Sequence, residues 1–216
     1  MRTEYSAVLL LTAAWGSYFL LHSLLASLSV KRWVAGRWPD LMPLYRLFFN
    51  AAATLLLIPP LWLTFSLRGP YLWQWSGGWW WLANGLAVAA LLGVFWSLRY
   101  YDSGEFLGTR QWRRKERSVE DQERFHVSDL HRFVRHPWYS LSLVLVWTRD
   151  MDLSFLVSAC LISLYFVIGS RMEESKLITY HGEAYRRYQK KVPRLIPLPW
   201  RYLSEAEARQ LEQEAR

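Results

Sequence analysis

Two clusters of ionisable and aromatic side chains, well separated in sequence, could do chemistry together. The first is Arg135-His136-Pro137-Trp138-Tyr139, and the second is Arg171-Met172-Glu173-Glu174. The amino end of a helix binds anions through its free N–H groups and its dipole, whereas carboxylates bind cations. Ionisable groups at the border of the membrane are therefore a candidate functional site. A plainer alternative is that Arg135 and Arg171 reach lipid headgroups and pair with the two glutamates.

A third cluster follows on the carboxyl side of the second. It reads His181-Gly182-Glu183-Ala184-Tyr185-Arg186-Arg187-Tyr188. Tyr185, Tyr188 and Val192 share one face of a helix, and Pro193 should end it. Taken alone, this pattern predicts an amphipathic helix that lies on the membrane surface.

Other kinds of site find little support. The chain lacks the glycine-rich phosphate-binding motifs of the common nucleotide folds, and nothing local suggests a serine-based triad. Its single cysteine, Cys160, excludes a disulfide scaffold and a thiolate zinc site. Because the five histidines show no i, i+4 pair, support for a metal or haem is weak and no metal is predicted.

The elements that position these clusters are long stretches of sequence without charged residues. Four stretches carry no Asp, Glu, Lys or Arg, namely Ser6–Val30, Leu47–Leu67, Gly69–Leu98 and Leu153–Ser170. Since roughly 20 apolar residues cross a bilayer, a soluble globular protein is excluded. We predict an all-α integral membrane protein of about five transmembrane segments in one membrane domain. Its parts are three spans in 1–98, a cytoplasmic loop in 99–135, a helical hairpin in 136–170 and a cytoplasmic region in 171–216.

The expected hairpin brings the first two clusters to one membrane face. Pro137 suits the first turn of a short helix, and Asp152 suits the cap of the longer helix that follows. Further on, Ser204-x-x-Glu207 is a capping box. It predicts a solvated helix over Ser204–Arg216, whose removal should matter little because it carries none of the clusters.

The positive charges indicate topology rather than nucleic-acid binding. Lys and Arg number 26 against 18 Asp and Glu. Nearly all of the basic residues lie between the first two apolar stretches, in the polar stretch 99–135, and in the tail from Arg171 onward. The positive-inside rule then puts the amino terminus outside and the carboxyl terminus in the cytoplasm. We expect the basic excess to contact membrane lipids, and no nucleic acid as partner. The first apolar stretch is expected to be a retained span.

Three spaced motifs resemble those of the isoprenylcysteine carboxyl methyltransferase family of integral membrane enzymes. The bacterial branch that methylates small thiols such as methanethiol looks most similar. The motifs are Arg135-His136-Pro137-x-Tyr139, then Glu173-Glu174-x-x-Leu177-x-x-x-His181-Gly182-Glu183-x-Tyr185-x-x-Tyr188, then Val192-Pro193-x-x-Ile196-Pro197. The chain departs from the family pattern at Asp129, Leu141 and Gly169.

The resemblance implies a methyltransferase of the bacterial inner membrane that uses S-adenosylmethionine. Its acceptor would be a small thiol or a lipophilic carboxyl group that enters from the bilayer. Arg171 and Glu174 are the catalytic candidates, and Arg171 could orient the acceptor or lower its pKa. Cofactor-binding residues carried over by motif are Gln111, His131, His136, Pro137, Trp138, Tyr139 and Glu173. The sequence does not predict the oligomeric state.

Two alternatives stay open at this point. Phospholipid N-methyltransferases share the general architecture. The other is a non-catalytic membrane protein, similar to the accessory proteins of nitrogen-oxide respiration. It is favoured by Asp129 and Leu141, which stand where the family pattern has glycine, and by Gly169, which stands where the family has an arginine.

Overall fold

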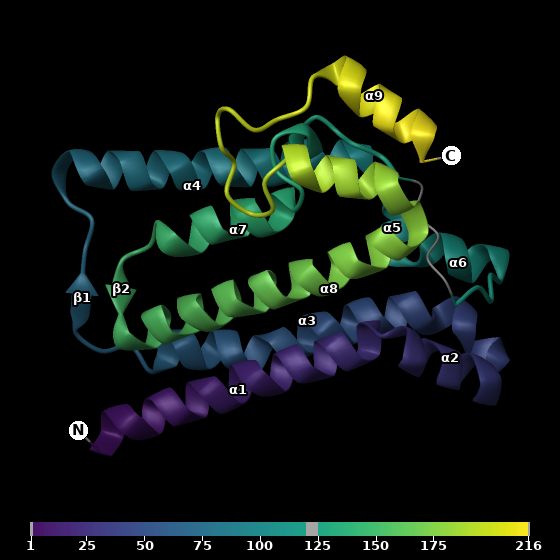
Figure 1. Cartoon of the computed structure of the whole chain (residues 1–216). Helices are drawn as coiled ribbons and strands as arrows, with labels where there is room; N and C mark the ends of the chain where they lie inside the picture. Colours follow the sequence, from purple (N-terminus) through teal and green to yellow (C-terminus); the bar gives the residue numbers. More distant parts are fainter. Residues whose placement is uncertain (1, 120–124, 216) are drawn as a thin grey trace. The chain divides into compact units, whose positions relative to one another are not determined.

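The computed structural model describes residues 2–119 and 125–215, and the side chains of residues 2–4 are left aside. It confirms the all-α prediction, since helices dominate and the only named strands in the described residues are two short ones (Figure 1). The helices are α1 (Arg2–Ala26), α2 (Leu28–Arg37), α3 (Met42–Ser66), α4 (Gly77–Ser97), α5 (Ser103–Leu107), α6 (Thr109–Arg114), α7 (Pro137–Trp147), α8 (Leu153–Lys191) and α9 (Glu205–Glu214). The strands are β1 (Tyr71–Trp73) and β2 (Met151–Asp152).

Within residues 2–119 and 125–215, four helical segments are long and apolar enough to cross a membrane. They are Tyr5–Ala26, Pro39–Ser66, Gly77–Tyr100 and Leu153–Lys191. The chain is therefore an integral membrane protein. The fourth of the five expected spans corresponds to α7, which has only 11 residues. At ~1.5 Å per residue its length is about 16 Å, roughly half of a bilayer core, so the total of five crossings stays a prediction.

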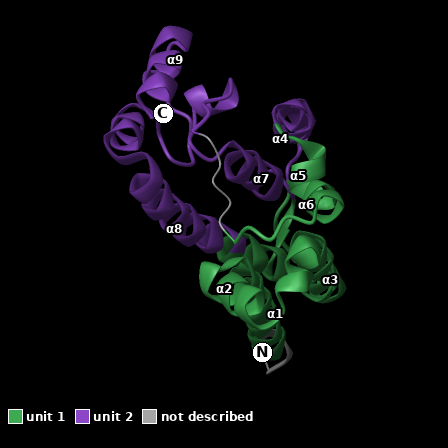
Figure 2. Ribbon diagram, turned by 90° about the vertical axis from the view of Figure 1, so that its right-hand side faces the viewer, with its two compact units in different colours: residues 1–74, 101–122, 150–161 green, residues 75–100, 123–149, 162–216 purple. Residues whose placement is uncertain are grey.

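The chain divides into two compact units, each assembled from separated stretches (Figure 2). Unit 1 comprises residues 1–74, 101–122 and 150–161. Within it α1 packs on α3, and the indole of Trp15 donates to Ser158 Oγ at 2.9 Å. Thr64 Oγ1 lies 2.7 Å from the same hydroxyl. Hydrogen bonds among buried side chains hold helices together in lipid, where no water competes for them.

Part of the stretch expected as a loop over 99–135 is helical in unit 1. Helices α5 and α6 meet at Gly108, whose φ is +91°. A Cβ there would lie 2.8 Å from the backbone nitrogen of Leu47 on α3. Close by, Asn50 Nδ2 donates to the carbonyl oxygens of Phe106 and Leu107 at 3.0 and 3.1 Å. Close packing of this turn on α3 thus requires glycine.

Unit 2 comprises residues 75–100, 123–149 and 162–216, and it holds the first two clusters. Here α4 packs against α7, and Trp138 Nε1 donates to Ser97 Oγ at 2.7 Å. The prediction for Pro137 is confirmed, since it lies in the first turn of α7. The cap predicted at Asp152, in unit 1, is confirmed too, because its Oδ1 accepts from Phe155 N at 2.9 Å.

Helix α8 is broken at Gly182, which has φ 53° and ψ −127°. Side chains other than glycine rarely adopt these angles. After Gly182 the chain turns back, so the end of α8 runs alongside its own earlier part in Figure 1. Residues 183–191 therefore return toward the second cluster instead of continuing away from it.

The returning segment forms a protein core, so the prediction of a helix lying on the membrane surface is wrong for its apolar face. Tyr185, Tyr188 and Val192 are buried with residues from three other parts of unit 2. These partners are Val127, Leu203, Ala208 and Leu211. Helix α9 supplies two of them, and so the expectation of a merely solvated terminal helix is also wrong. Its predicted capping box, Ser204 with Glu207, is confirmed.

Candidate active site

The first cluster is fixed by backbone hydrogen bonds to the segment after α8. The N–H groups of Arg135 and His136 donate to the carbonyl oxygens of Pro193 and Arg194, at 2.9 and 3.1 Å. His136 is then the capping residue of α7, and Pro137 opens the helix. Proline suits this position because its fixed φ is helical and it needs no hydrogen-bond acceptor there.

Glu174 is the centre of the site. Its carboxylate is 2% exposed and accepts hydrogen bonds from four side chains. Oε1 accepts from Arg135 Nε at 2.7 Å and lies 3.2 Å from His136 Nε2. Oε2 accepts from Gln189 Nε2 at 3.0 Å and from Arg194 Nη2 at 2.8 Å. A buried carboxylate with this many donors stays ionised, and it orients every group that binds it.

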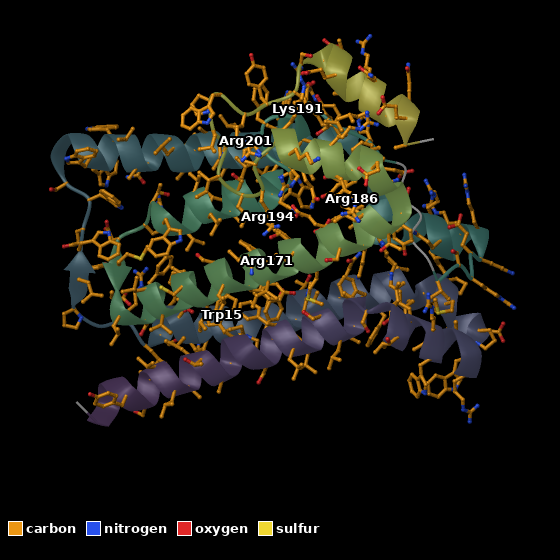
Figure 3. The ribbon with its side chains drawn as sticks, in the orientation of Figure 1. Trp15, Arg171, Arg186, Lys191, Arg194 and Arg201 are labelled. Atoms are coloured by element: carbon orange, nitrogen blue, oxygen red, sulfur yellow. The ribbon has the colours of Figure 1, made fainter. Side chains whose placement is uncertain are left out.

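The break at Gly182 makes this arrangement possible. On an unbroken helix, Gln189 would lie fifteen residues beyond Glu174, about 22 Å along the axis. In the structure the amide nitrogen of Gln189 is 3.0 Å from the carboxylate. Arg194, still further along the chain and labelled in Figure 3, donates to the same carboxylate oxygen.

His136 is held between two carboxylates. Its Nε2 faces Glu174, and its Nδ1 lies 3.4 Å from an oxygen of Glu173. Burial alone would lower the pKa of His136, but the hydrogen bonds to Glu173 and Glu174 outweigh burial and raise it. Unlike Glu174, the side chain of Glu173 is 52% exposed. It thus presents an accessible negative charge beside a histidine that favours its protonated form.

An aromatic stack extends from His136. The ring of Tyr139 is parallel to that of His136, with centroids 5.4 Å apart, and to that of Phe166, at 4.6 Å. Gly169, on α8, is near the Tyr139 hydroxyl, 3.9 Å from where a Cβ would be. The structure therefore brings His136, Tyr139 and Glu173 together on neighbouring elements of one unit.

The other sequence-predicted residues are placed differently. His131 Nδ1 is 2.7 Å from Ser128 Oγ, and burial lowers the pKa of His131 to about 4, helped by the nearby charges of His136 and His126. Gln111 belongs to unit 1, where its amide donates to the carbonyl oxygen of Glu105 at 3.2 Å.

The side chain of Arg171 takes no part in the hydrogen bonds and ion pairs found among the described residues of the site. Its side chain is exposed, and no hydrogen bond or ion pair of its guanidinium is found among the described residues. It precedes Glu173 by two positions on α8, and such residues point to different sides of a helix.

Sequence reasoning missed three residues that shape the site. Arg194 and Gln189 bind Glu174, and Phe166 stacks on Tyr139. Arg194 could have been found from the Val192-Pro193 motif, because it is the next residue. Phe166 lies in an apolar stretch of α8, where nothing distinguishes it from a lipid-facing residue.

Comparison with known proteins places the chain in a family. It is 30% identical over 190 residues to a methanethiol S-methyltransferase of Pseudomonas deceptionensis, across 82% of this chain and 67% of that protein. A methanethiol S-methyltransferase of Bradyrhizobium diazoefficiens is 30% identical, across 82% and 68%. A protein-S-isoprenylcysteine O-methyltransferase of Schizosaccharomyces pombe is 34% identical, across 38% of this chain and 36% of that protein. No family model and no solved structure matches.

The chain is therefore a helical membrane methyltransferase. It belongs to the isoprenylcysteine carboxyl methyltransferase family, within the branch of the bacterial thiol methyltransferases. The recognition made from its three motifs is confirmed.

Proposed function

We propose that the chain transfers a methyl group from S-adenosylmethionine to a small thiol, with methanethiol as the first candidate. The matches that cover about four fifths of the chain are named methanethiol S-methyltransferases. The isoprenylcysteine match covers only 38% of it. This difference in coverage favours a small thiol over a prenylated carboxyl acceptor.

The residues of the site fit the donor. S-Adenosylmethionine carries an ammonium group, a carboxylate, an adenine ring and a sulfonium-bound methyl group that it supplies for transfer. The exposed carboxylate of Glu173 suits the ammonium group. The aromatic side chains of Trp138 and Tyr139 suit the adenine ring or the sulfonium charge. The amino end of α7, which no side chain caps, suits the carboxylate. The single observation that carries the proposal is the exposed Glu173 beside the stacked pair His136 and Tyr139.

The protein's own residues bind and orient in this proposal. Glu174 fixes Arg135 and His136, so that α7 begins at one defined place relative to α8. Because its pKa is raised, His136 serves as a hydrogen-bond donor rather than as the base that takes the thiol proton. Glu174 thereby becomes a positioning residue, and Arg171 remains a candidate for binding the acceptor.

The transfer itself is an in-line displacement. The thiol sulfur gains the methyl group and its proton leaves to solvent, while the donor's sulfonium becomes a neutral thioether. Such a step depends on alignment and on exclusion of water more than on acid–base chemistry. We further propose that the site faces the cytoplasm of a bacterial inner membrane, with the amino terminus outside, because the basic residues gather on that side.

The test uses the purified protein in lipid nanodiscs. Transfer of a radiolabelled methyl group is followed with methanethiol, a prenylated cysteine and phosphatidylethanolamine as acceptors. Donor affinity is measured by calorimetry for the wild type, Glu173→Gln and the matched control Glu183→Gln. Glu183 lies on the same helix and is exposed, and its carboxylate pairs only with Arg186 among the described residues.

We expect transfer to methanethiol and a large loss of donor affinity in Glu173→Gln alone. A lost hydrogen bond to a charged group, about 1.5–3 kcal/mol, corresponds to a loss of roughly 10- to 150-fold. Equal affinity in Glu173→Gln and wild type would contradict the site. Preferred methylation of the phospholipid would contradict the acceptor.

A further inference from the structure

An exposed apolar loop follows α8 in unit 2. Ile196 is 71% exposed, Trp200 75% and Tyr202 50%, and three prolines (Pro193, Pro197 and Pro199) stiffen the segment. Tyr202 stacks on the exposed Phe133, with ring centroids 5.8 Å apart. Tryptophan and tyrosine in such positions are typical of the interface between membrane and water, where one end of the ring is apolar and the other polar.

Hydrogen bonds place this loop near the end of a membrane span. Just before the loop, Pro193 and Arg194 accept from the backbone N–H groups of Arg135 and His136. Just after it, the N–H of Leu203 donates to the carbonyl of Arg132 at 3.0 Å. Trp138, two residues after His136, is hydrogen-bonded to Ser97 at the last turn of α4. The loop is therefore fixed beside the end of the span Gly77–Tyr100 rather than far out in solvent.

The charges around the loop are positive and only partly neutralised. Residues 184–204 contain six Lys and Arg and no Asp or Glu; Figure 3 labels four of them. Glutamates pair with Arg186, Arg187, Lys191 and Arg194. Lys190 and Arg201 have no carboxylate partner among the described residues, and nor does the nearby Arg132. Arg201 Nη2 donates to the backbone carbonyl of Lys190 at 2.7 Å, so the Arg201 guanidinium lies against the end of α8.

We propose that the loop Leu195–Tyr202 is a membrane anchor that binds anionic phospholipid. Its apolar side chains enter the leaflet at the Tyr100 end of α4. The three cations for which the described part of the chain offers no carboxylate bind anionic headgroups. Apolar and aromatic residues flanked by basic ones have the chemistry of that surface. The anchor is separate from the donor and the acceptor, and it holds whichever thiol the enzyme methylates.

The anchor has a direct link to the active site. The carbonyl groups of Pro193 and Arg194 hold the backbone of Arg135 and His136, and the Arg194 side chain binds Glu174. Lipid binding at Trp200 therefore stabilises the segment that orders the site. Withdrawal of the loop from the membrane would loosen the same segment.

The experiment measures the depth of the loop with a fluorescent label in the full chain. Cys160, the only cysteine, is replaced by serine, and a nitrobenzoxadiazole label is attached in the variants Trp200→Cys and, separately, Ile196→Cys. The matched control is Gln213→Cys, an exposed position on α9. Each protein is placed in nanodiscs of phosphatidylcholine alone or with phosphatidylglycerol. Quenching is measured with aqueous iodide and with spin-labelled lipid.

We expect the labels at 196 and 200 to be quenched severalfold more by spin-labelled lipid than the label at 213, and less by iodide. Phosphatidylglycerol should move both labels deeper into the bilayer. Lys190→Gln should reverse part of that movement, because each positive charge removed should lower the ratio of inserted to withdrawn loop about fivefold. Equal iodide quenching at all three positions would overturn the anchor, and would point instead to a surface for another protein. Equal depth in both lipid mixtures would overturn the anionic preference. Two label positions, both highly exposed, keep the test valid if one variant folds poorly.

Discussion

Replacement of Glu174 by alanine should destabilise the protein more than any other carboxylate substitution in unit 2. The variant removes the acceptor of four side chains, while Arg135 and His136 stay buried with 7% and 6% of their side chains exposed. Arg135 then loses its only carboxylate partner among the described residues. Removing one member of a buried ion pair costs about 3–5 kcal/mol, because the remaining charge is neither paired nor hydrated.

That cost is large beside the total stability of a typical protein, about 5–15 kcal/mol. For a chain of this size, 1 kcal/mol corresponds to roughly 2–4 °C in Tm, so Glu174→Ala should lower Tm by roughly 6–20 °C. Thermal unfolding of the purified protein in detergent, followed by circular dichroism, measures the shift.

Two matched variants make the test specific. Glu183→Ala, on the same helix, should change stability by no more than about 0.5 kcal/mol, as is usual for exposed positions. Glu174→Gln keeps the shape but loses the charge, so it should fall between Glu174→Ala and wild type. A Tm for Glu174→Ala within about 2 °C of the Glu183→Ala value would refute the assignment of Glu174 as the centre of the site.

Three further predictions concern the same unit. The pKa of His136 is raised in the folded protein, so its protonation contributes stability that is fully present below about pH 6.5 and is lost as pH rises through the folded pKa. The Tm of wild type should therefore fall relative to that of His136→Gln as pH rises above about 6.5. Gly182→Ala should cost about 1–3 kcal/mol of unfolding free energy, because alanine must adopt the glycine conformation. Removal of residues 204–216 should lower stability by about 2–4 kcal/mol, since it uncovers Tyr188 and Val192 and removes the buried Leu211.

Each of these has its own control. A constant Tm difference between wild type and His136→Gln from pH 6 to 9 would contradict the raised pKa. Gly36→Ala, at a helical glycine with open space around it, should be neutral or stabilising; if Gly182→Ala behaved in the same way, the break in α8 would not depend on glycine. A truncated chain as stable as wild type would restore the expectation of a merely solvated terminal helix.

The sequence predicted the membrane helices and the meeting of the two clusters because both depend on local signals. Uncharged stretches define spans by length alone, and Pro137 and Asp152 mark helix starts through short-range hydrogen bonding. The crossing of the membrane by the short α7 and the single membrane domain stay predictions.

The contacts that could not be predicted from the sequence depend on the direction that the chain takes after Gly182. A glycine inside a helical pattern is compatible with a straight helix or with a reversal, and only the reversal brings Gln189 to Glu174. Without it, Tyr185 and Tyr188 were expected to face lipid, and α9 had nothing to pack on. The same reversal explains why Glu174 is buried as a positioning residue while Glu173 stays accessible.

The reversal at Gly182 also sets an order of events during synthesis. Glu174 leaves the ribosome before Gln189 and Arg194, the partners that complete its shell. Until residues 189–194 follow, a nascent chain can insert its apolar helices but carries a carboxylate with too few donors. Insertion of the apolar helices therefore does not require a finished site, and the site is complete only once residues 189–194 have folded back on Glu174.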